Sequence, residues 1–219
     1  MKRHPFLLSG VLLGVLAGCQ TSSVLMTTDP RSPVRLHLAA TEPLVVAKQI
    51  LLLPPTGVTD PGVRHGFQQK LFRSAQRYFD APVQMVTGDS AYAAYLSDSN
   101  LTHADGSFNL PEITGIGKLM KVTHVICPTI RDIRPYHPQQ INLSITVIHV
   151  ETGKITANLS GVFDASDPVV QKYFRNYRTK NKTKDSSPND LRMEMRSPAM
   201  FQTFVSEVCC TLLADKLPL

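Results

Sequence analysis

The segment that decides the fold is residues 141–163, INLSITVIHVETGKITANLSGVF. Apolar and polar residues alternate on both sides of its centre, as expected of strands that bury one face. The central ETGK, residues 151–154, predicts a hairpin turn. The segment therefore predicts two antiparallel strands, at residues 141–150 and 155–163.

Upstream of this hairpin the chain predicts three more strands and a long helix. Residues 49–53 (QILLL) form a continuous apolar run that two prolines end, which is typical of a buried central strand. Residues 82–87 and 122–130 predict the other two strands. Between the first two strands, Thr59 or Asp60 can cap a helix that has Pro61 in its first turn and continues to residue 79.

Further helices are expected at residues 89–97, 110–121 and 198–216, and after a cap at Ser166 or Asp167 with Pro168 in the first turn. Residues 98–109 and 179–195 are expected to be polar loops. The order is β-α-β-α-α-β-β-β-α-α. Since β-α-β crossovers imply parallel pairing and hairpins are antiparallel, we expect an α/β (mixed α+β) fold. A single mixed sheet with helices packed on it would form one domain, residues 48–219.

Composition excludes several other classes of protein. The chain has 219 residues, of which 42% are hydrophobic and 18% charged, so it can form a core and is not wholly disordered. Four cysteines are too few for a disulfide-dense miniprotein. The mean hydropathy of −0.06 excludes a protein with many membrane spans.

The N-terminus predicts export and lipidation. Lys2 and Arg3 precede an apolar stretch, residues 6–16, that is too short to span a bilayer. Leu16, Ala17, Gly18 and Cys19 follow and resemble a lipobox, where a signal peptidase cuts before a diacylated, palmitate-bearing cysteine. An ordinary secretory peptide, with Cys19 an unmodified thiol, is the alternative. Gln20 then implies the outer membrane, because an aspartate there usually retains lipoproteins at the inner membrane.

These expectations divide the chain into residues 1–18, a signal peptide, residues 19–47, a lipidated cysteine with a flexible tether, and residues 48–219, a periplasmic domain. The tether contains Pro30, Pro33 and Pro43 and has weak periodicity. Fully extended, residues 20–47 reach about 90 Å. Removal of the signal peptide lowers the formal net charge from +6 to +4. The expected location is the outer membrane, lipid-anchored and facing the periplasm.

The lipobox, the apolar first strand at residues 50–55 and the hairpin at 147–163 together resemble a group of envelope lipoproteins. The group includes the curli secretion channel subunit, the Pel polysaccharide export lipoprotein, the activators of penicillin-binding proteins and the N-terminal domain of TolB. The resemblance covers residues 48–216. It implies a non-catalytic periplasmic domain that binds proteins or assembles into a ring.

Few residues suggest catalysis or metal binding. His124 and His149 lie in adjacent predicted strands, but if Ile133 pairs with Ile141 a regular register puts the two imidazoles on opposite faces of the sheet. We therefore expect no metal site and no cofactor. Asp164 and Asp167 look like a carboxylate pair, although Asp167 beside proline is better explained as a helix cap.

We interpret the glycines of residues 114–118 and the remaining cysteines as packing residues, not as parts of a binding or catalytic site. The segment TGIGK, residues 114–118, lacks the spacing of a phosphate loop, so Gly115 and Gly117 are expected to relieve crowding between helix and sheet. Once Cys19 is lipidated, three thiols remain, and we interpret them as buried hydrophobic residues. A disulfide between Cys127 and either Cys209 or Cys210 is the alternative.

The most unusual local feature is the basic segment KYFRNYRTKNKTK, residues 172–184. Two interpretations stay open: a patch that binds an acidic protein, wall polymer or lipid headgroup, or a helix whose aromatic residues pack inward while its charges are solvated. Export makes nucleic acid an improbable partner. The cationic residues of this segment are Lys172, Arg175, Arg178, Lys180, Lys182 and Lys184.

Together these observations favour a non-catalytic outer-membrane lipoprotein that is an assembly or scaffold component of an envelope secretion, polymer-export or appendage complex. It would bind the membrane through its lipid anchor, contact an envelope protein partner, and could form a homo-oligomeric ring. One alternative is a tethered regulator of a peptidoglycan synthase. A second alternative is an envelope hydrolase or metalloprotein.

Overall fold

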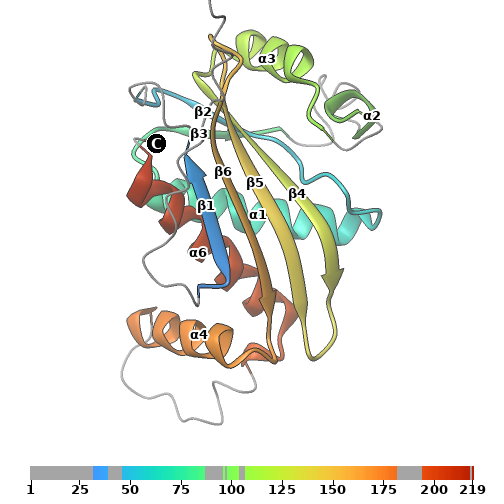
Figure 1. The fold of residues 1–219 in the computed structure, drawn as a ribbon, viewed down its shortest axis with the longest axis vertical. Helices are drawn as coiled ribbons and strands as arrows, with labels where there is room; N and C mark the ends of the chain where they lie inside the picture. The colour runs from blue at the N-terminus through green and yellow to red at the C-terminus, as the bar shows by residue number, and fades with distance from the viewer. Residues whose placement is uncertain are drawn as a thin grey trace, which may run out of the picture.

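A six-stranded mixed sheet forms the centre of the computed structural model (Figure 1), which describes residues 32–38, 46–86, 96, 98–103, 107–181, 194–217 and 219. The strand order is β1-β6-β5-β4-β2-β3. The strands are β1 (Val34–Leu38), β2 (Ile50–Leu52), β3 (Val83–Met85), β4 (His124–Arg134), β5 (Gln140–His149) and β6 (Ile155–Asp164). The helices are α1 (Pro61–Tyr78), α2 (Asp98–Leu101), α3 (Leu110–Leu119), α4 (Pro168–Asn181) and α6 (Pro198–Lys216).

The sheet has the predicted mixture of parallel and antiparallel pairing. The short strand β2 is parallel to both β3 and β4, and the long β4, β5 and β6 form antiparallel pairs. The turn between β5 and β6 contains Gly153, whose φ of 67° lies in the left-handed region that glycine adopts without strain. The α/β fold class expected from the sequence is therefore confirmed.

Strand β1 was not expected. Val34–Leu38 lies within residues 19–47, the stretch interpreted as a tether, yet it pairs antiparallel with β6, Val34 opposite Gly161 and Leu38 opposite Ala157. Val34 is fully buried in the main core. The domain boundary at residue 48 is therefore wrong for this segment, because an isolated five-residue strand has too little periodicity to be distinguished from an extended tether.

Helices cover both faces of the sheet. Helices α1 and α6 pack on one face, where Phe67, Leu71 and Phe204 contact inward residues of the strands. Helices α2 and α3 cover the other face at the end that includes β2, through Leu101, Ile113 and related residues. Among the described residues, none of the helices has the length and hydropathy needed to cross a membrane.

The two longest helices begin and end where the sequence predicts. The Asp60 carboxylate accepts hydrogen bonds from the backbone N–H groups of Gly62 and Val63, so α1 begins at Pro61. The Ser197 hydroxyl accepts from the Met200 N–H at 3.5 Å, so α6 begins at Pro198. Caps and proline in the first turn satisfy or remove N–H groups that would otherwise lack partners.

The middle of the chain differs in detail from expectation. Strand β4 continues to Arg134, beyond the predicted end at residue 130, and α2 forms in residues 98–101, which were expected to be loop. Helix α4 extends to Asn181, into the loop predicted at 179–195. The helix predicted at 89–97 lies outside the described residues except for Leu96.

The two glycines of TGIGK have different environments on α3. A methyl group added at Gly117 would lie 2.6 Å from Val150 Cγ2 and 3.1 Å from Val125 Cγ2, so this glycine lets α3 approach the sheet closely. A methyl group added at Gly115 would meet no atom within 4 Å. The expected relief of crowding is confirmed for Gly117 and is wrong for Gly115.

The three cysteines that the structure describes are free and buried. Cys127 belongs to the core cluster beneath α3, whereas Cys209 and Cys210 belong to the cluster beneath α1 and α6, on the opposite face of the sheet. Burial raises the pKa of all three thiols. The interpretation as buried hydrophobic residues is confirmed, and a disulfide from Cys127 to either of the others is excluded in this structure.

Candidate functional site

A cationic groove between α1 and α6 is the strongest candidate site. Its volume is about 470 Å³, and helix α1 contributes Lys70, Arg73 and Arg77 to its wall. These residues lie three, four or seven positions apart, so they share one face of the helix. The opposite face of α1 contributes Phe67, Leu71 and Ala75 to the core, which fixes the basic face toward solvent.

Glu207 from α6 is the acidic residue in the wall of this groove, and its carboxylate already has two partners. Arg77 Nη1 lies 3.3 Å from Glu207 Oε1, and the Tyr78 hydroxyl donates to Glu207 Oε2 at 2.9 Å. Burial raises the pKa of Tyr78, and the hydrogen bond to Glu207 and the negative charge of Glu207 raise it further. Glu207 therefore positions Arg77 and joins the two helices at one end of the groove.

The positive charges of Lys70 and Arg73 are less completely balanced by acidic groups than that of Arg77. Lys70 is half-buried and its ammonium donates to the backbone carbonyl of Gly66 at 3.3 Å. Burial, with the neighbouring Arg73 charge, lowers the pKa of Lys70. Within the part of the chain that the structure describes, neither side chain has an acidic partner. Such a concave surface can bind an anion.

Sequence reasoning missed this groove. The first wall comes from the helix that the sequence predicts after Pro61, but the second wall comes from α6, about 130 residues away. One sequence signal was present: α1 contains Arg64, Lys70, Arg73 and Arg77 and no acidic residue. An amphipathic helix whose polar face has one sign of charge indicates an anionic partner.

The basic segment 172–184 is described only in part. Lys172 and Arg175 are exposed on α4. Arg178 is instead paired with Glu194, with distances of 2.6 Å from Nε to Oε2 and 2.7 Å from Nη2 to Oε1. The side chain of Lys180 lies outside the described part, as do Lys182 and Lys184. Binding by this patch stays a prediction.

The aromatic residues of α4 pack inward. Phe174 is fully buried, and Tyr173 and Tyr177 pack against the main core. The Phe174 and Tyr177 rings lie 5.2 and 5.5 Å from the ring of Phe204 on α6, measured between centroids. These rings therefore hold α4 on the domain, as one of the two interpretations of the segment proposed.

His124 and His149 face each other, contrary to expectation. Ile133 does pair with Ile141 as assumed, but a bulge between Ile130 and Asp132 shifts the register by one residue. The two histidines are therefore directly opposite, with ring centroids 5.1 Å apart. The prediction of opposite faces is wrong, because the extra residue at the bulge shifts the pairing by one position and so changes which residues of the two strands lie opposite each other on the same face.

Both histidines of this pair are buried and held by threonines. His124 Nδ1 lies 3.1 Å from Thr123 Oγ1, and His149 Nδ1 lies 3.0 Å from Thr152 Oγ1. Burial, with the adjacent His149, lowers the pKa of His124 to about 4. Within the described residues, His, Cys, Asp and Glu side chains form no group of three or more that could hold a metal ion.

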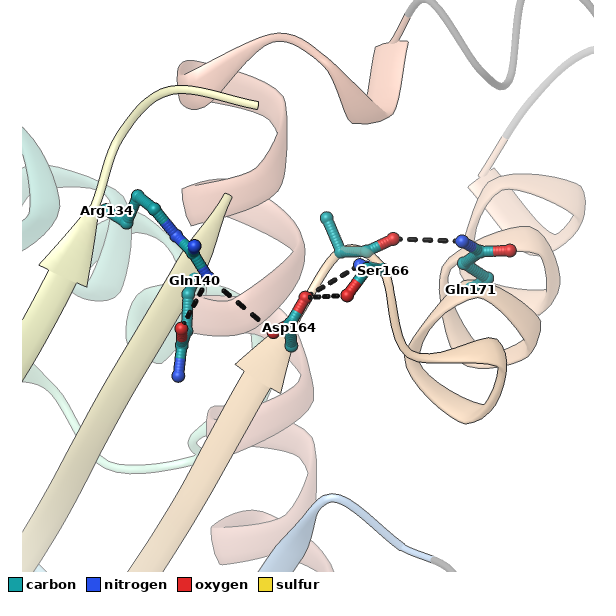
Figure 2. A network of polar contacts seen from close by, with 6 residues as sticks. Arg134, Gln140, Asp164, Ser166 and Gln171 are labelled. Carbon is teal, nitrogen blue, oxygen red and sulfur yellow. Dashed lines mark hydrogen bonds and ion pairs between the residues drawn. The ribbon is translucent and has the colours of Figure 1, made fainter. Parts of the chain in front are cut away.

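Asp164 and Asp167 do not form a catalytic pair. Figure 2 shows Asp164 at the end of β6, where Oδ1 accepts hydrogen bonds from the Ser166 N–H and hydroxyl and Oδ2 lies 3.7 Å from Arg134 Nη2. The bonds from Ser166 are the main cause of the lowered pKa of Asp164. Asp167 Oδ1 accepts from the Val169 N–H at 2.7 Å, which confirms its interpretation as a helix cap.

Comparisons with known proteins give low similarity. No family model and no curated protein matches this chain. Among solved structures, a PelC dodecamer from Paraburkholderia phytofirmans has a TM-score of 0.40 at 9% identity, over 63% of this chain and 86% of that chain. Lipoprotein GNA1162 from Neisseria meningitidis has a TM-score of 0.39 at 12% identity, over 61% and 95%.

The hypothetical protein CT253 from Chlamydia trachomatis is a third similar structure, with a TM-score of 0.35 at 14% identity over 74% of this chain and 93% of that chain. GNA1162 is described as a lipoprotein. Because the TM-scores are this low, the similarities carry no argument about function.

Proposed function

We propose that this chain is an outer-membrane lipoprotein whose periplasmic domain acts by binding, as a scaffold component of an envelope secretion, polymer-export or appendage complex. The lipobox ending at Cys19 supports the anchor. Acyl chains on a cysteine give durable attachment, because each buried CH₂ contributes about 0.8 kcal/mol. Cleavage before Cys19 makes it the first residue of the mature chain.

The observation that carries this proposal is the pairing of β1 with β6. Since the sheet begins at Val34, only residues 20–33 lie between Cys19 and the folded domain. Fully extended, these residues span about 45 Å, half the reach expected when the tether was taken to end at residue 47. The domain is therefore kept near the membrane surface, where an export or secretion complex in that membrane is within reach.

The short connection weakens the main alternative, a regulator that crosses the wall to reach a peptidoglycan synthase, because such a regulator needs a long tether. The buried polar groups also favour binding over hydrolysis. Glu207, His124 and His149 are buried, and each has hydrogen bonds to groups of the fold itself.

Crosslinking in cells, followed by identification of the captured proteins, tests the proposal. We expect components of one envelope secretion or export complex. Capture of a synthase alone, with a monomeric particle size, would support the regulator instead, whereas a ring would give one large discrete species. The matched control is Cys19→Ser, which keeps the domain and removes the acylated thiol. If this variant still fractionates with outer membranes after a wash in about 500 mM salt, which removes electrostatic attachment but not acyl chains, the anchor is refuted.

A further inference from the structure

The groove between α1 and α6 contains an unbalanced positive charge in a concave surface. Three cations, Lys70, Arg73 and Arg77, line a groove whose acidic lining residue, Glu207, is already bound by Arg77 and Tyr78. Taking a cation partly out of water without an opposite charge is unfavourable, and an anion in the groove offsets that cost. The groove is therefore electrostatically complementary to an anion.

The side chains in the groove suit a phosphate group. Arginine can donate two parallel N–H bonds to phosphate oxygens, and lysine binds phosphate as a point charge. Lys70 and Arg73 are three residues apart and Arg77 is four further on, so all three can reach one group on the same helix face. The hydroxyl-bearing residues Ser74 and Thr203 also line the groove.

The rest of the lining suits the remainder of a lipid headgroup. Ala199 and Met200 on α6 add apolar surface beside the cations, which a glycerol backbone can contact. A volume of about 470 Å³ is within the range of small-molecule sites. Arg73 and Arg77 are exposed at the groove, so their guanidinium groups are accessible to a ligand from solvent.

We propose that this groove binds the phosphate of an anionic phospholipid headgroup, so that the exposed face of α1 lies against the membrane that holds the anchor. The choice of a membrane over other anionic partners rests on the proposed function, because a connection of about 45 Å keeps the domain beside phospholipid at all times. Anionic lipids attract each nearby Lys or Arg, which adds a second attachment to the acyl anchor.

Vesicle co-sedimentation of the mature Cys19→Ser chain tests this inference without interference from acyl chains. The vesicles contain phosphatidylcholine, which forms neutral bilayers alone, with or without about 30 mol% phosphatidylglycerol, which gives them a negative surface. We expect binding only to the anionic vesicles, weakening as salt rises from about 50 to 500 mM, because salt screens exposed charges.

The groove variant is Lys70→Gln with Arg73→Gln, and its matched control is Lys118→Gln with Arg131→Gln, which removes the same charge from exposed positions on α3 and β4, outside both the groove and the basic segment 172–184. We expect about a 30-fold loss of vesicle affinity in the groove variant, because each cation near an anionic surface contributes about fivefold in affinity and two are removed. The control should lose less than about threefold. Exchange of the two cations, Lys70→Arg with Arg73→Lys, keeps both charges and should retain binding, and circular dichroism of each variant checks that it is folded.

Several results would overturn the inference. Equal losses in the groove and control variants would indicate general surface charge, and no binding to anionic vesicles would exclude a membrane ligand. Displacement from vesicles by about millimolar inorganic phosphate would indicate a small-anion site, and preference for polyglutamate would indicate an acidic protein partner. Failure here leaves the fractionation of the Cys19 and Cys19→Ser chains unaffected, so the anchor and the groove are judged separately.

Discussion

Replacing Gly117 by alanine adds one methyl group at the contact between α3 and the sheet. The new Cβ would lie 2.6 Å from Val150 Cγ2 and 3.1 Å from Val125 Cγ2, both buried beneath the helix. Either the valines or the helix must move, since contacts this short are repulsive. The same change at Gly115, two residues earlier on the same helix, meets no atom within 4 Å.

The two variants differ in packing and share their backbone effect. Alanine is favoured over glycine inside a helix by about 1 kcal/mol at either position. Overpacking of a filled core costs about 1–3 kcal/mol and applies only at residue 117. We therefore expect Gly115→Ala to raise the free energy of unfolding by up to about 1 kcal/mol, and Gly117→Ala to lie about 1–3 kcal/mol below it.

Urea unfolding of the purified variants, followed by circular dichroism, measures this difference. A third variant, Val150→Ala, removes the side chain that makes the closest contact. In that background Gly117→Ala should cost less than it does in the native sequence, which a double-mutant cycle reports directly. Equal free energies for the two glycine variants would refute the close approach of α3 described here.

Three further predictions concern the cores and the histidine pair. The pKa of His124 is lowered to about 4 from 6.5, so between these pH values this imidazole is protonated in the unfolded chain but neutral in the folded one. The contribution of His124 to the free energy of unfolding is therefore fully present above pH 6.5 and falls by up to about 3 kcal/mol as the pH drops to 4. Urea titrations should show the difference in free energy of unfolding between the native chain and His124→Asn narrowing by that amount over this range; a difference that does not change with pH contradicts the burial of His124. Phe204→Ala should lower the free energy of unfolding by about 3–5 kcal/mol, because the Phe204 ring is fully buried among four other aromatic rings. Phe204→Leu should lower it much less in the same thermal or urea unfolding experiment, and equal losses would contradict that packing. A thiol reagent should label none of the buried cysteines, Cys127, Cys209 and Cys210, in the native domain and all three in urea. Rapid labelling of the native domain would contradict their burial.

Local signals predicted the elements well where capping and periodicity agree. The starts of α1 and α6 are marked by Asp60 with Pro61 and by Ser197 with Pro198. At any helix N-terminus a short polar side chain can accept hydrogen bonds from the unpaired backbone N–H groups, and proline has no N–H that needs a partner. The hairpin at β5 and β6 was equally predictable, since its glycine lies where the turn needs a positive φ. Such features depend only on neighbouring residues.

Features that depend on distant partners were not predictable. The bulge near Asp132 has no sequence signature, yet it decides that His124 and His149 meet. Strand β1 is recognisable only once β6 is in place to pair with it. The cationic groove likewise needs α1 and α6 to be packed together, so its cations appear in the sequence as an ordinary solvated helix face.

The position of β1 also bears on the order in which the domain is assembled. Val34 pairs with Gly161, so the first strand to be synthesised contacts the last strand of the sheet. In a chain that emerges N-terminus first, β1 has no partner until β6, the last of the six strands, has been made. The outer edge of β6 is then exposed until β1 pairs with it and covers that edge. Closure of the sheet at this edge therefore waits for its first-made and last-made strands to meet.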